Sequence, residues 1–177
     1  MSMDKLNEDF TKLYKRWKGG EVRKEDKLDR EAVRKFINDN YRYIDENKIT
    51  MHESCVDYDG DIIITKTDDL GFKFGKVTGN FYASHIDIED LKFMPKYVCG
   101  TLDISHNKLK SFKGCPEEVG GSLIARDCRN LESLEGLPKH IGGNLLITSP
   151  NLFGDEYELP EGIVIDGKVN APIKKKK

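Results

Sequence analysis

Two histidines and an aspartate recur at one fixed spacing: His85, His106 and Asp127 are each 21 residues apart. Side chains separated by one structural repeat line up in a row, so imidazole, imidazole and carboxylate would become neighbours. Such a cluster can bind a metal ion or act as a general base. The row contains no nucleophile, and no glycine loop of the phosphate-binding type opens a helix. We therefore predict no enzyme, no cofactor, and a contact surface at this row.

The four cysteines do not have the spacing of a metal site. They are 44, 16 and 13 residues apart, and no Cys-x-x-Cys pair occurs. The absence of a run of about 18–20 apolar residues argues against a membrane span, and the N-terminus lacks a secretory signal. We expect a cytoplasmic protein without metal, in which small apolar thiols are buried. The cysteines are Cys55, Cys99, Cys115 and Cys128.

The elements that would position the row are marked by five glycines. Each opens a short segment of alternating apolar residues, and the glycines are 19, 21, 21 and 22 residues apart. A repeat of this length indicates stacked units whose strands pair in parallel, with alternate residues pointing into the stack. The glycines are Gly60, Gly79, Gly100, Gly121 and Gly143. The expected inward residues are Ile62, Ile64, Phe81, Ala83, Leu102, Ile104, Leu123, Ala125, Leu145 and Ile147.

One unit carries the most regular pattern. Residues 102–109 read LDISHNKL, which matches the signature L-x-L-x-x-N-x-L with isoleucine at one leucine position. Segments 111–116 and 133–138 are similar to the S-L-x-x-L-P stretch of short repeats. The array over about residues 56–165 therefore resembles the leucine-rich repeats of bacterial effector proteins, and still more the small Gly-Gly-containing arrays of tailed-phage proteins.

The resemblance implies an α+β fold built on a short leucine-rich-repeat solenoid of about five to six turns over residues 56–170. The Asn107 side chain is expected to bond buried backbone groups where the chain bends away from the strand. Cys128 takes this place in the next unit. Pro150 lies near it in the unit after, so we expect that unit to be distorted. Residues 163–165 are predicted to form the last strand.

The N-terminal segment, residues 1–50, is expected to be helical. Apolar residues recur at steps of three and four from residue 3 to 17 and again from 28 to 44. Asp26 or Asp29 is the expected start of the second helix. Because an open stack exposes an apolar face at each end, we predict that these helices cap its N-terminal end. The alternative is a separate helical module that carries the activity.

Charge is unevenly distributed along the chain. Residues 1–48 carry +2, residues 49–173 carry −8, and the last four lysines add +4, which gives the net −2. An acidic array disfavours nucleic-acid binding and favours a protein partner with a basic patch. Residues 171–177 are predicted to be a disordered basic tail.

Stacked strands would align their outward residues in columns on the concave face of the solenoid. The first column is unusually apolar, and exposed apolar strips mark interfaces. The alternative is that a loop or the N-terminal helices cover it. The columns are Ile63, Tyr82, Asp103, Ile124 and Leu146; Thr65, Ser84, Ser105, Arg126 and Thr148; and Lys66, His85, His106, Asp127 and Ser149. The predicted partner-binding residues are Ile63, Tyr82, Ser84, His85, Asp103, His106, Ile124, Arg126 and Leu146.

Together these patterns predict a non-enzymatic protein-binding module. The likeness to tailed-phage arrays implies an inhibitor or modulator of a host protein, acting in the host cytoplasm. The alternative is a nucleic-acid-associated regulator that works through the basic residues between positions 12 and 24. The sequence predicts no membrane partner, and it leaves the oligomeric state and the identity of the partner open.

Overall fold

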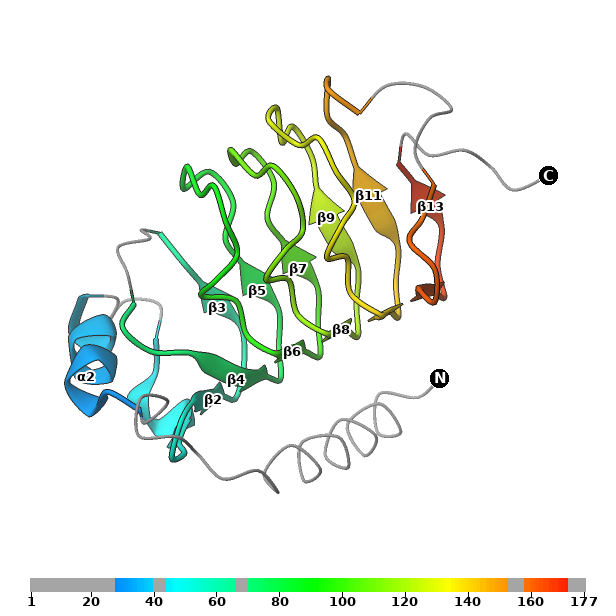
Figure 1. Cartoon of the computed structure of the whole chain (residues 1–177). Coiled ribbons are helices and arrows are strands. Elements are labelled where there is room, and N and C mark those ends of the chain that lie inside the picture. The colour runs from blue at the N-terminus through cyan, green and yellow to red at the C-terminus, as the bar shows by residue number, and fades with distance from the viewer. Residues whose placement is uncertain (1–27, 40–43, 66–69, 153–157, 172–177) are drawn as a thin grey trace.

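A computed structural model describes residues 28–39, 44–65, 70–152 and 158–171 of the chain. These residues wind into a solenoid of parallel strands with about five turns (Figure 1). Each turn contributes two short strands, so two parallel sheets run side by side along the solenoid. The expected first helix over residues 3–17 and most of the basic tail lie outside the described residues.

The six-stranded sheet contains the strands that follow the glycines. All of its neighbouring strands pair in parallel, as the repeat predicts. Its last strand follows a sixth glycine, Gly167, which the sequence pattern did not single out. The strands are β3 (Ile62–Ile63), β5 (Phe81–Tyr82), β7 (Leu102–Asp103), β9 (Leu123–Ala125), β11 (Leu145–Ile147) and β13 (Val169–Asn170).

The seven-stranded sheet is formed by the residues that precede the glycines, and the sequence analysis did not predict it. It begins with an antiparallel pair and continues in parallel. The expected strand at residues 163–165 is present as Val164–Ile165, but it belongs to this sheet. The strands are β1 (Ile49–Met51), β2 (Val56–Tyr58), β4 (Phe74–Val77), β6 (Tyr97–Val98), β8 (Glu118–Val119), β10 (His140–Ile141) and β12 (Val164–Ile165).

The core fills the inside of the coil, enclosed by the two sheets and by the return segments, which contribute residues such as Phe112 and Leu131. Every predicted inward residue is buried, and none is more than 2% exposed. The seven-stranded sheet adds inward residues from the other side, such as Val98, Val119 and Ile141. Full burial of such a side chain contributes about 1.5–3 kcal/mol. The hydrophobic effect therefore holds the turns together.

Glycine is required where the chain passes between the sheets, because successive turns approach closely there. The Gly121 N–H donates to the Gly100 carbonyl oxygen at 2.9 Å, and the Gly143 N–H donates to that of Gly121 at 2.8 Å. A Cβ atom at Gly121 would lie 2.7 Å from the backbone of Gly100 and Thr101. Any other residue would push the turns apart.

A ladder of polar side chains follows the glycines. In each turn the residue after the glycine accepts a hydrogen bond from the backbone N–H of its counterpart in the next turn. Five such bonds occur in succession: Asn80 N–H to Asp61 (2.7 Å), Thr101 to Asn80 (2.7 Å), Ser122 to Thr101 (3.4 Å), Asn144 to Ser122 (3.0 Å) and Lys168 to Asn144 (2.8 Å).

Asn107 bonds the backbone as predicted. It is 4% exposed. Its side-chain amide donates to the carbonyl oxygens of Ala83 (2.7 Å) and Ile104 (2.9 Å), and its oxygen accepts from the N–H groups of Ile86 (3.2 Å) and Ile88 (3.3 Å). One side chain thus satisfies four buried backbone groups at the bend.

In later turns, other side chains form hydrogen bonds with the backbone groups at the corresponding bend. The Cys128 thiol lies 3.5 Å from the Ile104 carbonyl oxygen. In the unit after, Pro150 is exposed. The buried Ser149 hydroxyl donates to the Leu131 carbonyl oxygen (3.2 Å), and Asn151 donates to that of Arg129 (2.6 Å). Two polar side chains therefore replace the single asparagine in that turn.

The helix α2 (Arg30–Asp39) packs against the first turns of the solenoid. Asp29 begins it by accepting hydrogen bonds from the N–H groups of Glu31 (2.9 Å) and Ala32 (3.1 Å). The Phe36 ring meets Phe72 and Phe74 edge-on at 5.4 and 5.7 Å. A single turn of 3₁₀-helix, η2 (Glu46–Lys48), leads into β1. Within the described ranges, no helix has both the length and the apolar character that a membrane crossing needs.

Replacing Asn107 with leucine should lower the free energy of unfolding by about 1–3 kcal/mol, because buried backbone groups lose their partners. Urea unfolding followed by circular dichroism measures the change. The neighbouring exposed Lys108 supplies the control, since Lys108→Leu should have a much smaller effect. Equal stability of the Asn107→Leu variant and the unmodified protein would contradict the proposed role of this side chain.

Candidate protein-binding surface

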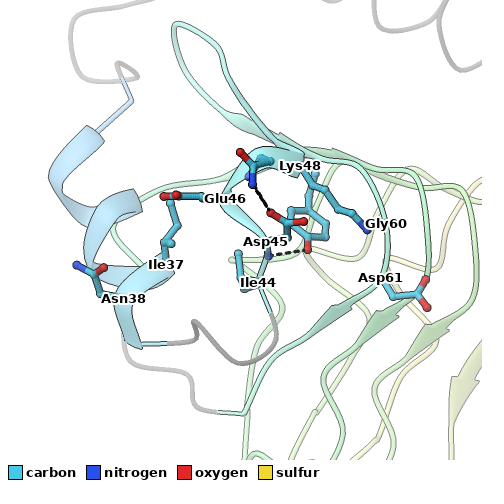
Figure 2. Close-up of a pocket in the computed structure, with 10 residues that line it drawn as sticks. Ile37, Asn38, Ile44, Asp45, Glu46, Lys48, Gly60 and Asp61 are labelled. Carbon is cyan, nitrogen blue, oxygen red and sulfur yellow. Dashed lines mark hydrogen bonds between the residues drawn. The ribbon is translucent and has the colours of Figure 1, made fainter.

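A polar hollow beside α2 is one candidate site (Figure 2). Its polar groups are largely occupied by the protein itself. The Tyr58 hydroxyl accepts the Asp45 N–H at 3.1 Å, and the Asp45 carboxylate accepts the Asn47 N–H at 3.0 Å. Asp61 also borders the hollow and already belongs to the ladder. The hollow therefore serves mainly to join neighbouring segments of the protein. The sequence analysis did not point to it.

The outward residues of the six-stranded sheet form the second candidate. Strand register places Tyr82 beside Asp103, Asp103 beside Ile124, and Ile124 beside Leu146. Ile63 is paired with Tyr82 at the N-terminal end and is 41% exposed, and the other four side chains are half-buried. We call these residues the outer strip: Ile63, Tyr82, Asp103, Ile124 and Leu146.

The second predicted column is tied together by hydrogen bonds between turns. The Ser105 hydroxyl accepts the Arg126 N–H at 3.1 Å, and the Thr148 hydroxyl accepts the Asp127 N–H at 2.9 Å. Ser105 is only 5% exposed, so it positions the backbone and offers little to a partner. Ser84 is half-buried, and Arg126 and Thr148 are exposed. Arg126 is the charged side chain of this column.

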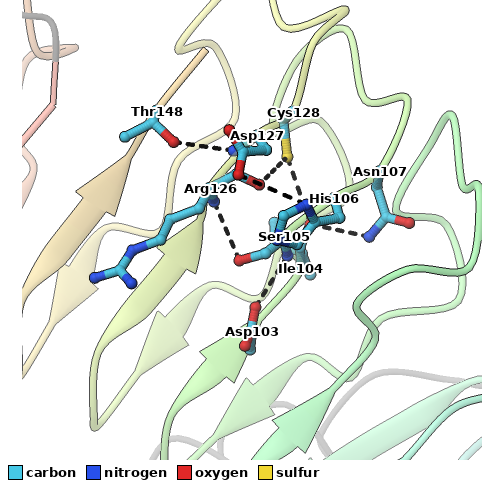
Figure 3. A network of polar contacts seen from close by, with 9 residues as sticks. All are labelled: Asp103, Ile104, Ser105, His106, Asn107, Arg126, Asp127, Cys128 and Thr148. Carbon is cyan, nitrogen blue, oxygen red and sulfur yellow. Dashed lines mark hydrogen bonds and ion pairs between the residues drawn. The ribbon is translucent and has the colours of Figure 1, made fainter.

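The third column brings the two histidines and the aspartate together, as their spacing predicts. Figure 3 shows His106 and Asp127 of this row. The rings of His85 and His106 stack with centroids 4.0 Å apart and planes 16° apart. His106 Nδ1 lies 3.6 Å from Asp127 Oδ2. Ser149, at the other end of this column, is buried, and Lys66 lies outside the described residues.

The backbone of this row lies in the left-handed region. His85, His106 and Asp127 have φ angles of 58°, 57° and 52°. This conformation is unfavourable for side chains with a Cβ atom, although aspartate, asparagine and histidine tolerate it better than most. The row therefore marks the sharp corner at which each turn leaves the sheet.

The stacked rings are poorly arranged for metal binding. Nitrogen lone pairs lie in the plane of an imidazole, so those of two parallel rings run side by side and do not converge on one point. Within the part of the chain that the structure describes, no group of three histidine, cysteine or carboxylate side chains could hold a metal ion.

Three thiols of the solenoid are poor nucleophiles. Burial raises the pKa of the Cys128 thiol, which lies under the corner of the row. Burial likewise raises the pKa of Cys99 and of Cys115. A raised pKa keeps a thiol in its neutral form, and the thiolate is the reactive species. Cys55, Cys99 and Cys128 are buried, as the sequence analysis expected, whereas Cys115 is only partly buried and departs from that expectation.

The structure thus gathers the predicted binding residues on one face of the six-stranded sheet and along its adjoining corner. Sequence reasoning missed the ladder of hydrogen-bonding side chains that follow the glycines. The polar residue after each glycine was a signal that could have revealed it. No protein-family model, curated protein or solved structure matches this chain. The function proposed below rests on the geometry of the outer strip and its neighbours.

Replacing His106 with valine should lower the free energy of unfolding by about 1–3 kcal/mol, because a β-branched residue strains a left-handed backbone. Replacing it with asparagine, which tolerates this conformation, should cost much less. Chemical denaturation of the two variants measures the difference. Equal losses in the two would show that ring contacts, and not backbone conformation, determine the residue at this corner.

Proposed function

We propose that this protein is a non-enzymatic binding module that holds another protein on the outer face of the six-stranded sheet. The observation that carries the proposal is the outer strip, in which two accessible apolar pairs on neighbouring strands, Ile63 with Tyr82 and Ile124 with Leu146, flank Asp103. Tyrosine and arginine dominate the energetics of many interfaces, and Tyr82 and Arg126 lie on this face. Accessible apolar strips of this kind mark interaction sites.

The side chains that could take part in catalysis are arranged in a way that supports binding and not catalysis. The stacked histidines have parallel rings that do not converge on a bound ion or substrate atom. Burial keeps the neighbouring Cys128 thiol in its neutral form. Neither group therefore has the arrangement of an activated nucleophile with its base.

The resemblance to tailed-phage and bacterial-effector repeats supports a more specific role. In this role the protein is a phage-encoded inhibitor or modulator of a host protein and acts in the host cytoplasm. The charge of −8 over residues 49–173 favours a partner that carries a basic patch, because opposite charges speed encounter. This part of the proposal rests on analogy.

We also propose that the N-terminal helical segment caps the solenoid. The stack would otherwise expose apolar side chains of its first turns to water. Val33 and Phe36 of α2 are buried, and Phe36 contacts the rings of Phe72 and Phe74. These contacts support a covering role for α2, and the helix expected over residues 3–17 lies outside the described residues.

Replacing both Tyr82 and Ile124 with aspartate should abolish partner binding and leave the fold intact, because both side chains point away from the core. The measurement is retention of a host protein from a bacterial lysate by the immobilised chain, with the retained protein identified by mass spectrometry. Val164→Asp is the matched control: this side chain is 55% exposed on the seven-stranded sheet. Undiminished retention by the Tyr82/Ile124 variant would exclude the outer strip as the binding site.

Deleting residues 1–45 should leave a fragment that aggregates or lacks a cooperative unfolding transition, because the apolar end of the stack loses its cover. Solubility and thermal unfolding of the fragment 46–177 measure this. A soluble fragment that unfolds cooperatively would refute the capping role.

A further inference from the structure

Arg126 is the exposed cation at the centre of the binding face. It follows β9, and its backbone N–H is held by the Ser105 hydroxyl of the preceding turn at 3.1 Å. Its side chain extends away from the polar network of the corner (Figure 3). Among the residues that the structure describes, none forms a hydrogen bond or ion pair with its guanidinium group. The backbone is therefore fixed while the charged group remains available.

The nearest carboxylates on this face are engaged elsewhere. Asp103 Oδ1 accepts the backbone N–H of Ser105 at 3.0 Å. Asp127, next to Arg126 in sequence, directs Oδ2 toward His106 Nδ1 at 3.6 Å. Further along the corner, Asp87 pairs with Lys108 at 3.1 Å. These contacts hold the carboxylates of Asp103 and Asp127 on other partners, and no described carboxylate forms an ion pair with Arg126.

An apolar surface adjoins Arg126. Ile124 lies on β9, two residues before Arg126 in the chain, and Leu146 is its partner on the next strand. Both side chains are half-buried. A partner side chain packed on this pair would exclude water, and a charge pair beside it would be stronger than one in open solvent.

We propose that the partner places a carboxylate side chain against Arg126 and an adjacent apolar side chain on Ile124 and Leu146. This inference rests on the proposed function and specifies the partner's chemistry. Guanidinium groups bind carboxylates with two parallel hydrogen bonds, a geometry that lysine cannot reproduce. A partner that is basic overall can still make this contact, because net charge acts at long range whereas Arg126 acts on one group.

Nucleic acid fits this face less well. A phosphate could also approach Arg126, but the same sheet presents the carboxylates of Asp61, Asp103 and Asp127. Neighbouring phosphates of a nucleic-acid strand would meet these negative charges, since a polyanion requires several cations for tight binding. A protein segment with one acidic residue among apolar neighbours avoids this repulsion.

Selection of displayed random 12-residue peptides on the immobilised full chain tests the proposal. The enriched peptides should contain aspartate or glutamate beside an aliphatic or aromatic residue. Binding of one such synthetic peptide should weaken at least about tenfold in Arg126→Ala, the loss typical of a central contact residue. Arg126→Lys should recover only part of it. Arg129→Ala, which removes another exposed arginine, is the matched control and should bind normally.

Three results would overturn the inference in distinguishable ways. If peptides bind through Tyr82 and Ile124 but lack acidic residues, or if Arg126→Ala binds them normally, the carboxylate contact is wrong and the binding face stands. If no peptide is enriched, or if the Tyr82/Ile124 aspartate variant binds the peptides normally, the proposed function fails as well. If a fluorescent single-stranded oligonucleotide binds the unmodified protein and its affinity falls in Arg126→Ala, the partner is a nucleic acid and the proposed partner class is wrong.

Discussion

The close approach of successive turns at the glycine corners is the constraint on which the rest of the structure depends. The backbone of Gly121 contacts that of Gly100 so closely that a Cβ atom would not fit. This approach brings each following N–H within reach of a side-chain acceptor in the previous turn, as for Thr101 on Asn80. Hydrophobic burial supplies most of the stability, but it is not directional. The ladder of hydrogen bonds sets the register between successive turns, and so determines which residues are neighbours.

The proposed binding face follows from this register. A shift of one residue in any strand would send its outward side chains into the core. Because the turns cannot slip, the half-buried Ile124 and Leu146 stay adjacent and Arg126 stays beside them. The corner row has the same origin, since the stacked rings of His85 and His106 require equivalent positions in consecutive turns. The face is therefore built on a rigid scaffold, which lowers the entropy cost of binding.

Much of this arrangement could be predicted from the sequence because one sheet repeats a clear signal. Alternating residues after each glycine identified the inward side chains, and the motif around Asn107 identified the bend. The second sheet was missed because its later strands place only one or two apolar residues before a glycine, as at His140–Ile141. The alternation after the glycines is longer and continues beyond the strand ends, as from Leu102 to Ile104. Ser149 was placed on the surface because its unit departs from the motif. The direction of the Arg126 side chain depends on contacts between turns, which spacing alone does not reveal.

Amide hydrogen exchange at the ladder positions tests the central claim most directly. The N–H groups of Asn80, Thr101 and Asn144 lie at a corner beside accessible side chains, where an ordinary loop would exchange rapidly. If each donates to a side chain of the previous turn, all three should be protected to a similar extent and should lose protection together as the solenoid unfolds. Rapid exchange at these positions, with protection retained in the strands, would contradict the account.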